Sequence, residues 1–419
     1  MRRTTGFLLA LLCVAACRET PPPVRLNVLD PGHFHAALVQ KHPLEGVNDT
    51  VRVYAPEGPE LQQYLSTVAS YGLSWQEELH TGEDCLELLP PARERDAVVL
   101  AGNNARKAEY ILQAIRKGYH VLADKPMALT PEDNARLQEA YRTAEEKGLV
   151  ILELMTERYD PLNIRIRERI PDLGGILPGT AGNPAIVMES VHHFYKEVSG
   201  KPLVRPAWYY DVRCQGEGIA DVTTHLIDLV FWQCFPGEAI TRDDVKVVSA
   251  SHYPTLISPD EFRRSTGEPN FPDTLVPDAN GFLPVFSNGS ITFCVKGVYV
   301  KMDVRWDFEG GPDTFRADYL CRDGEVQVRQ DAATGFRRVL DIAGKDETPD
   351  PGPGHEEHFS LVTKAFLDYV TGKEPIPGPE RENTLAKYAV TTEAVRLARC
   401  WKTAHILLKI KCFTPFFPR

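Results

Sequence analysis

The chain has 419 residues, 43% of them hydrophobic and 25% charged, which is the composition of an ordinary soluble globular protein. Its length allows two domains and a sizeable core. The formal net charge of −11 argues against a nucleic-acid partner and against a basic surface that would bind anionic lipids.

The first 24 residues have the features of an export segment. Residues 7–16 form an apolar run that is too short to span a bilayer as a helix. The run ends in Val-Ala-Ala-Cys, which resembles a bacterial lipobox, so residues 1–17 are expected to be a signal peptide that leaves Cys17 as the lipidated first residue. An ordinary signal peptide that contains a cysteine is the alternative. Residues 18–24, with three prolines, would tether an exported, periplasmic-side protein to the membrane by its lipid anchor only.

Residues 25–150 alternate short buried strands with helices. Strands are expected at 25–30, 50–55, 97–101 and 120–123, each followed by a loop. This alternation predicts an α/β domain with a Rossmann-like, doubly wound parallel sheet. Loops at the carboxyl ends of its strands would line one crevice, which is where such sheets bind ligands.

The first strand runs into a tight turn and a helix, the opening of a dinucleotide-binding unit in which backbone N–H groups hold a pyrophosphate. Of the usual GxGxxG pattern only Gly32 remains, and a turn without any ligand is the alternative. The cofactor-binding residues predicted at the crevice are Pro31, Gly32, His33, Phe34, His35, Asn103, Asn104, Asp124 and Lys125.

A second stretch with candidate catalytic residues begins at Gly216. Its pattern predicts a mostly buried helix. Asp221 and His225 are four residues apart, so their side chains lie on one helix face. A carboxylate one turn below an imidazole orients the ring and favours its protonated form, which suits proton transfer near neutral pH. A buried pair that only holds the helix in place is the alternative.

Residues 151–345 change to alternating segments that predict an α+β domain with a large, mainly antiparallel sheet. A surface insertion is expected at 254–285, a linker at 346–354, and helices that pack near the nucleotide domain at 355–405. The cysteines beyond the export segment have no metal-ligand spacing, so no metal site is predicted, and no disulfide framework beyond one or two bridges. The tail at 406–419 has no interpretable pattern.

Three motifs in this order resemble those of the Gfo/Idh/MocA oxidoreductases. HVLADKPMALT at 120–130 is similar to the family's HVLCEKPLALT, with Asp124 in place of its glutamate. Residues 216–228 resemble GGGxxxDxGxHxxD, and residues 157–161 resemble the segment that opens the second domain. The 31–35 turn and the 354–359 stretch resemble an exported lipoprotein subgroup that acts on carbohydrates.

The resemblance implies a nicotinamide cofactor and an open-faced second sheet through which the chain would form a homo-oligomer. Lys125 stands where the family has a lysine that contacts nicotinamide ribose and substrate. Only Glu57 follows the second strand as an acid for a ribose hydroxyl, so NAD and NADP both stay open, with NAD favoured. Because an exported protein meets little free cofactor, the cofactor is expected to be tightly bound.

A carbohydrate substrate is expected because aromatic and imidazole side chains lie beside arginines just before the central helix. His192 and His193 would face opposite ways on a strand, so one of them reaches the site, and His193 is favoured. Core aromatics at a strand end are the alternative. The predicted substrate contacts are Arg158, Tyr159, His193, Trp208 and Arg213.

The predicted function is hydride transfer at a secondary hydroxyl of a sugar or glycoside, with the 3-hydroxyl as a candidate position. His225, oriented by Asp221, would take the hydroxyl proton while Lys125 stabilises the developing alkoxide, although which of Lys125 and His225 is the final base stays open. An NAD-dependent glycosidase that works by transient oxidation and elimination is one alternative. A non-catalytic sugar-binding lipoprotein is another.

Overall fold

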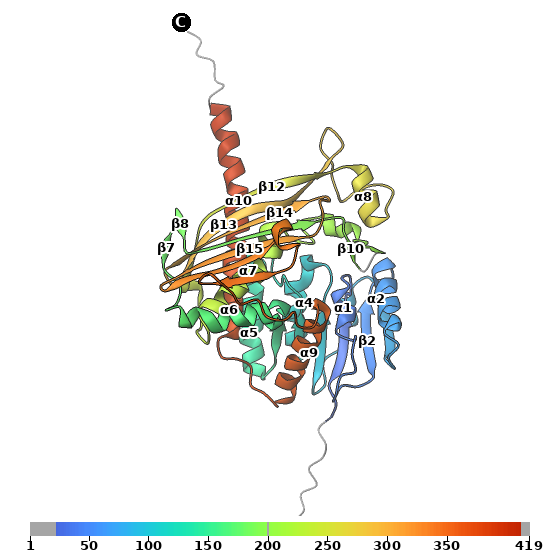
Figure 1. Cartoon of the computed structure of the whole chain (residues 1–419). Helices are drawn as coiled ribbons and strands as arrows, with labels where there is room; N and C mark the ends of the chain where they lie inside the picture. The colour runs from blue at the N-terminus through green and yellow to red at the C-terminus, as the bar shows by residue number, and fades with distance from the viewer. Residues whose placement is uncertain (1–21, 199–200, 412–419) are drawn as a thin grey trace, which may run out of the picture.

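The computed structural model describes residues 22–198 and 201–411 and shows two stacked domains (Figure 1). Helices surround a six-stranded parallel sheet in the first domain, and a large sheet forms the outer layer of the second. Cys17 lies outside the described residues. Among the described helices, none combines the length and the apolar character that crossing a membrane requires.

The first sheet has the order β3-β2-β1-β4-β5-β6, and all its pairs are parallel. The order reverses between β1 and β4, which makes their carboxyl ends the switch point where such sheets bind ligands. Its strands are β1 (Arg25–Leu29), β2 (Thr50–Ala55), β3 (Gln76–Thr81), β4 (Asp96–Leu100), β5 (His120–Ala123) and β6 (Ile151–Glu153). Its helices are α1 (His35–Leu38), α2 (Pro59–Ser70), α3 (Cys85–Leu88), α4 (Lys107–Lys117) and α5 (Pro131–Lys147).

The Rossmann-like sheet predicted from the sequence is confirmed, with two strands that the pattern did not indicate. β3 is an edge strand whose side chains are all exposed or half-buried, so it has no apolar alternation. β6 has only three residues, and it extends the sheet to Glu153, past the expected domain boundary at residue 150.

The second sheet has eight strands in the order β12-β13-β14-β9-β15-β16-β17-β18, and only its β9–β14 pair is parallel. This large, mainly antiparallel sheet was predicted from the sequence. Its strands are β9 (Ile186–His193), β12 (Val245–Ile257), β13 (Leu283–Val295), β14 (Val298–Asp307), β15 (Thr314–Cys321), β16 (Gly324–Gln330), β17 (Val339–Ile342) and β18 (Lys345–Asp346).

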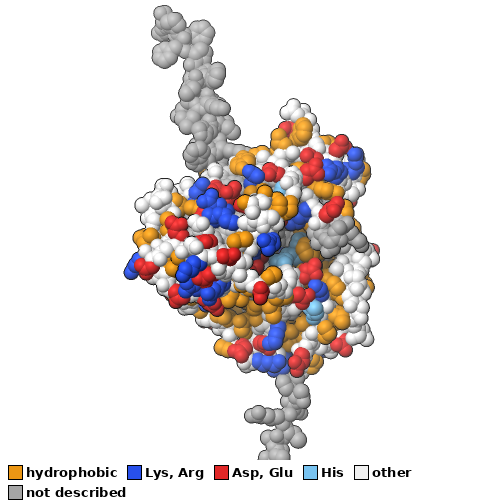
Figure 2. Space-filling model, viewed as in Figure 1, with side chains coloured by type: hydrophobic (Ala, Val, Ile, Leu, Met, Phe, Trp, Pro, Cys, Tyr) orange, Lys and Arg blue, Asp and Glu red, His pale blue; other side chains and the backbone are white. Residues whose placement is uncertain are grey.

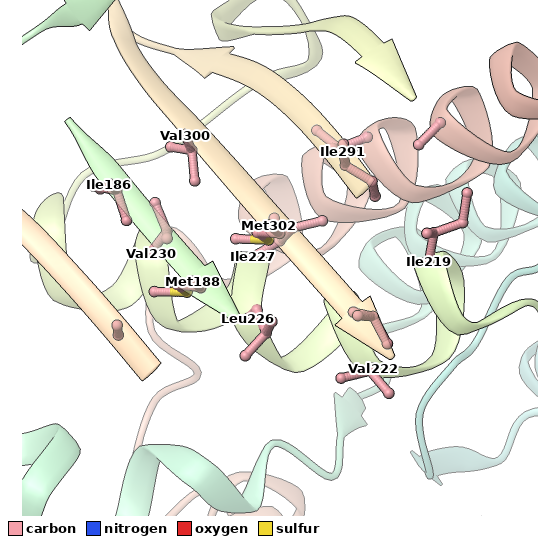
Figure 3. Close-up of a cluster of buried hydrophobic side chains, with 14 of the residues drawn as sticks. Ile186, Met188, Ile219, Val222, Leu226, Ile227, Val230, Ile291, Val300 and Met302 are labelled. Carbon is pink, nitrogen blue, oxygen red and sulfur yellow. The ribbon is translucent and has the colours of Figure 1, made fainter. Parts of the chain in front are cut away.

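One face of this sheet packs on α6 (Pro161–Asp172) and α7 (Gly218–Cys234). Figure 3 shows the contact, in which Met188 and Met302 of the sheet meet Ile227 of α7 in a buried cluster. Because side chains alternate along a strand, their neighbours point to the opposite face, where ion pairs such as Lys301–Asp303 and Arg316–Asp318 lie. Packing of a second copy of the chain against that face stays a prediction.

The stretch expected to be a surface insertion is more ordered than its composition indicates. β12 runs on to Ile257, and Ser258 caps α8 (Pro259–Thr266) through a capping box with Glu261. Phe262 of α8 is fully buried in the core of the second domain. Pro259 and the two acids after it therefore mark a helix start, while residues 267–282 form a loop between α8 and β13.

Two C-terminal helices tie the domains together. Phe359 and Phe366 of α9 (His355–Thr371) pack in the core of the first domain. α10 (Glu380–Lys411) contributes Ala386 and Val390 to the core of the second domain, while Tyr388 packs in that of the first. α10 also continues to Lys411, six residues past the expected helical segment.

A buried ionic network joins α10 to both domains. Lys387, with a fully buried side chain, donates to Glu153 at 2.6 Å and to Asp228 of α7 at 2.9 Å. Arg158 makes two 2.7 Å bonds to Asp228 and a third to Glu380. Burial alone would raise the pKa of Asp228, but the two cations outweigh it and lower the pKa.

We expect Lys387→Met to lower the free energy of unfolding at pH 7 by about 3–5 kcal/mol, because it leaves a buried carboxylate without its cation. Chemical denaturation of the full chain measures this. Arg396→Met is the control, since Arg396 lies on the same helix in an exposed pair with Glu393 and its loss should leave stability essentially unchanged. Equal stabilities of the two variants would contradict a structural role for the network.

Candidate active site

The loops after β1 and β4 meet at the switch point of the first sheet. A Cβ at Gly102 would lie 2.1 Å from the backbone oxygen of Asp30, so only glycine allows this contact. Asp30 itself has a φ of 52°, which is uncommon for a residue with a side chain. The backbone segments at Gly102 and Asp30 are therefore in direct contact where the first turn begins.

The turn from Pro31 to His35 differs from a glycine-rich phosphate loop. The N–H groups of Gly32 and His33 donate to the backbone oxygen of Ala101, at 3.3 and 3.1 Å, and α1 is only four residues long. Pro31 is buried in the turn and Phe34 is exposed beside it. The amides expected to hold a pyrophosphate are therefore already bonded within the protein.

The imidazoles of His33 and His35 turn toward the end of β5. Their Nδ1 atoms lie 3.7 and 2.9 Å from Oδ2 of Asp124. Burial lowers the pKa of His33 well below its ordinary value, and the neighbouring His35 lowers it further. Burial would raise the pKa of Asp124, but the adjacent His35 and Lys107 outweigh it, and the pKa is lowered.

Both predicted asparagines hold the loop after β4 in shape. Asn103 accepts a bond from the N–H of Ala105 at 2.9 Å, and the Asn104 amide donates to the backbone oxygen of Gln215 at 2.9 Å. The fully buried Lys107 donates to Asn104 and, at 3.0 Å, to the backbone oxygen of Asp124. Burial lowers the pKa of Lys107 to about 8. This lysine was missed in the sequence, where it begins an ordinary amphipathic helix.

Lys125 forms an ion pair across the two domains. Its Nζ lies 2.7 Å from Oδ1 of Asp221, in the first turn of α7. Burial would lower the pKa of Lys125, but the carboxylates of Asp221 and Asp124 raise it. Burial would raise the pKa of Asp221, but Lys125 lowers it. Both groups are therefore charged at neutral pH.

The position of Asp221 is fixed by how closely α7 packs on the second sheet. A Cβ at Gly218 would lie 1.8 Å from the backbone oxygen of Ser287, so the helix begins in direct contact with β13. This is the physical reason for the glycine-bounded start seen in the sequence. Thr223, where the motif has its inner glycine, is buried and donates to the backbone oxygen of Ile219 at 2.5 Å.

The predicted Asp221–His225 hydrogen-bonded pair is wrong. Asp221 bonds Lys125 instead, and Nδ1 of His225 has no hydrogen-bond partner among the described residues. Burial, followed by the nearby Lys125, lowers the pKa of His225 to about 3, whereas the sequence predicted a favoured imidazolium. His225 is thus a neutral imidazole at physiological pH.

His225 lines a cavity of about 880 Å³ between the domains. Figure 2 shows histidine side chains gathered in a hollow below the large sheet. The walls come from α7, from β9 and β15, from the 346–354 linker and from the start of α9. The titratable residues that line it are Glu157, Asp160, His192, His225, Asp313, Arg337, Arg338, Asp346, Asp350, His355 and His358.

The side chains of two predicted substrate contacts are engaged inside the protein. Arg158 belongs to the buried network with Asp228 and Glu380. Tyr159 packs against the core of the nucleotide domain. From the same segment Glu157 and Asp160 line the cavity, and Arg338 lowers the pKa of Glu157 against the effect of burial.

The other three predicted contacts also lie outside the cavity wall. His193 is buried, with Nδ1 3.3 Å from Asp313, and its strand neighbour His192 lines the cavity instead. Trp208 lies against Gly32 of the first turn. Arg213 pairs with Asp211 and leaves 69% of its side chain exposed.

Two residues of the cavity wall, Arg338 and His355, were missed in the sequence. Arg338 lies 2.7 Å from Asp160 and 3.5 Å from Glu157, and His355 Nδ1 lies 3.7 Å from Glu157. Arg338 comes from a region without a motif. His355 belongs to the 354–359 stretch, whose paired histidines were the available signal.

The edge of the first sheet fits a nicotinamide dinucleotide, although the first turn differs. Gly102 lets the loops after β1 and β4 meet without side chains between them, and Lys125 lies at the end of the next strand. The side chains in position to hold the cofactor are those of Asn103 and Lys125. Because the turn's amides are bonded to Ala101, side chains must supply more of the contact than in a glycine-rich loop.

Comparison with solved structures supports this architecture. A "putative oxidoreductase" from Parabacteroides merdae has a TM-score of 0.87 and 36% identity, over 91% of this chain and 98% of that one. Biliverdin reductase from Synechocystis, in complex with biliverdin and NADP+, has a TM-score of 0.59 over 90% and 99% of the two chains. At 15% identity, the second likeness shows the fold alone.

Among sequences, the chain is 29% identical over 199 residues to 1,5-anhydro-D-fructose reductase of Ensifer adhaerens, covering 46% of the chain and 53% of the relative. It is 30% identical over 213 residues to inositol 2-dehydrogenase 2 of Saccharopolyspora erythraea, covering 49% and 52%. The chain therefore spans about half the length of each of these relatives.

Two family models account for most of the chain. Residues 30–153 match "Oxidoreductase family, NAD-binding Rossmann fold", which supports a nicotinamide cofactor. Residues 166–351 and 350–399 match "Putative oxidoreductase C terminal domain". With the fold and the motifs in agreement, the chain belongs to the Gfo/Idh/MocA family of oxidoreductases.

Proposed function

We propose that this protein oxidises a secondary hydroxyl of a sugar or glycoside with a tightly bound nicotinamide cofactor, NAD favoured over NADP, and that the 3-hydroxyl is the position attacked. The observation that carries the proposal is the placement of Lys125 and His225. The ammonium of Lys125 is bonded to Asp221 at the edge of the Rossmann-like sheet, and the neutral imidazole of His225, one helical turn after Asp221, lines the cavity.

His225 and Lys125 have different roles at the substrate hydroxyl. His225 is neutral, so it can accept the hydroxyl proton at physiological pH. Lys125 keeps its charge through Asp221 and stabilises the negative charge that develops on the oxygen. The bound nicotinamide supplies the acceptor for the hydride. Asp221 acts as a positioning residue, because it holds Lys125 rather than the imidazole.

The cavity lining supports a carbohydrate as the substrate class. Glu157, His192 and Asp313 offer acceptors for hydroxyl groups, and Arg338 offers donors. The half-buried Phe315 in the same wall suits the C–H face of a sugar ring. The names of the two sequence relatives, a reductase of an anhydrosugar and an inositol dehydrogenase, agree with a polyhydroxylated substrate.

We include in this proposal an exported, lipid-anchored location, which the composition of the first 24 residues supports. Such a protein meets little free dinucleotide, so its cofactor must be retained and returned to the oxidised form in place. This requirement is why tight binding is proposed together with the activity.

The second candidate is a glycosidase that oxidises, eliminates and re-reduces its substrate. Glu157 and His355, 3.7 Å apart in the cavity, favour it, because they form an acid–base pair in addition to Lys125 and His225. Oxidation to a ketone acidifies the neighbouring C–H, and a second base could remove that proton and expel the aglycone. Water addition and reduction would then regenerate the oxidised cofactor.

We expect Lys125→Met to lower kcat by more than about 100-fold, because the alkoxide loses its charged partner. Turnover of methyl glycosides and myo-inositol with a redox dye measures this, and mass spectrometry of the nucleotide released on denaturation measures cofactor content. Lys364→Met on the exposed face of α9 is the control and should leave kcat unchanged. A folded Lys125→Met protein with bound cofactor and wild-type turnover would defeat the assignment.

We also expect kcat/KM to lack the fall near pH 6.5 that an unperturbed histidine base produces. The pKa of His225 is lowered to about 3, so the folded protein keeps this imidazole neutral as the pH falls from 8 to 5. The unfolded chain takes up the proton below about pH 6.5, so this group costs stability progressively from there toward pH 3. Rate profiles and melting curves over pH 5–8 test both statements, and a rate limb centred near 6.5 would refute the first.

A nitrophenyl glycoside separates the candidate functions. The dehydrogenase proposal predicts a stable keto-glycoside and no nitrophenol, detected by mass spectrometry and by absorbance. Release of nitrophenol together with free sugar would favour the glycosidase. Glycoside binding without either product, from protein that carries no nucleotide, would favour the non-catalytic sugar-binding protein.

A further inference from the structure

Three metal-ligating side chains converge beside the crevice. His33 and His35 come from the turn after β1, and Asp124 follows β5. One ligand atom from each lies within 4.8 Å of the others, and His35 and Asp124 are buried. We propose that these three residues bind one divalent transition-metal ion. The proposal does not rest on the redox function, and it departs from the sequence analysis, which predicted no metal site.

The backbone accounts for the convergence. Residues i and i+2 of the tight turn direct both imidazoles to one side, with ring centroids 4.0 Å apart and ring planes at 82°. Nitrogen and oxygen ligands lie about 2.0–2.2 Å from such an ion, so two ligand atoms on one ion are at most about 4.4 Å apart. The Nδ1 atoms of His35 and His33, at 2.9 and 3.7 Å from Asp124, already satisfy this limit.

The ligand set indicates the kind of metal. Two imidazoles and one carboxylate match Zn²⁺, Mn²⁺, Fe²⁺ or Co²⁺ better than Mg²⁺ or Ca²⁺, which prefer oxygen ligands.

A set of surrounding contacts holds the carboxylate in place. Oδ1 of Asp124 accepts from the N–H of Lys125 at 3.0 Å, which directs Oδ2 toward the histidines. The backbone oxygen of Asp124 accepts from the buried Lys107. The ring of Phe359, 4.4 Å from that of His35, limits its rotation. Such supporting contacts are typical of metal sites, where they orient the ligands.

A histidine elsewhere in the fold shows how this cluster differs from an ordinary buried pair. Nδ1 of His252 lies 2.6 Å from Glu217, and that carboxylate is shared with Arg399. A single imidazole on a carboxylate with a cationic partner is a structural ion pair. At Asp124 a second imidazole is present, so one carboxylate oxygen faces two imidazole nitrogens.

The test counts ions in the full chain. Protein stripped with a chelator is equilibrated separately with Zn²⁺, Mn²⁺ and Co²⁺, desalted, and measured by plasma mass spectrometry. We expect one ion per chain for at least one metal, and an absorption spectrum typical of nitrogen and oxygen ligands for Co²⁺. His33→Asn and His35→Asn should each weaken binding by more than about 100-fold, since they remove a direct ligand.

His252→Asn is the matched control, because it removes a buried, carboxylate-bound imidazole far from the cluster and should keep the full metal content. Should His35→Asn fail to fold, the half-exposed His33 still provides the variant, and the bound metal should raise the melting temperature of the wild type but not of His33→Asn. No metal in the wild type, or equal metal in all variants, which would be an adventitious ion only, overturns the proposal. Nucleotide content of the same samples separates this result from a failure of the redox function.

Discussion

The ion pair between Lys125 and Asp221 is the interaction on which the site depends. It links the carboxyl edge of the first sheet to the first turn of a helix whose position is set by the second domain. Removing two charges from water is costly, and the cost is offset only when the partners stay together. The pair therefore fixes the distance between the domains at the point where His225 meets the cavity, and its ammonium helps to keep that imidazole neutral.

The same helix is held a second time, two turns further on. Asp228 receives Arg158 and Lys387, so α7 presents one carboxylate to the nucleotide-domain strand and another to the C-terminal helix. Two charged attachments on one helix resist both sliding and rotation. A cavity whose wall is α7 is thus kept in register with the edge of the Rossmann-like sheet by ion pairs rather than by hydrophobic contact alone.

The sequence predicted the parallel sheet and the large antiparallel sheet because periodicity reports them directly, and the motif resemblance placed Lys125 and His225 in one site. It could not predict partners. Helical spacing put Asp221 beside His225, but a lysine from a distant strand is a stronger partner for a carboxylate than a neutral ring. Strand alternation put His192 and His193 on opposite faces, and His193 was favoured, but the packing of β9 directs His192 to the cavity. Arg158 resembled a ligand contact until Glu380, more than 200 residues away, completed its network.

The tilted contact between Phe359 and His35 connects two regions of the structure. α9 carries His355 into the cavity wall and, four residues later, sets Phe359 against the turn after β1. Because the two residues lie one turn apart on the same helix, a displacement of α9 that widens or narrows the cavity also changes the packing around His35.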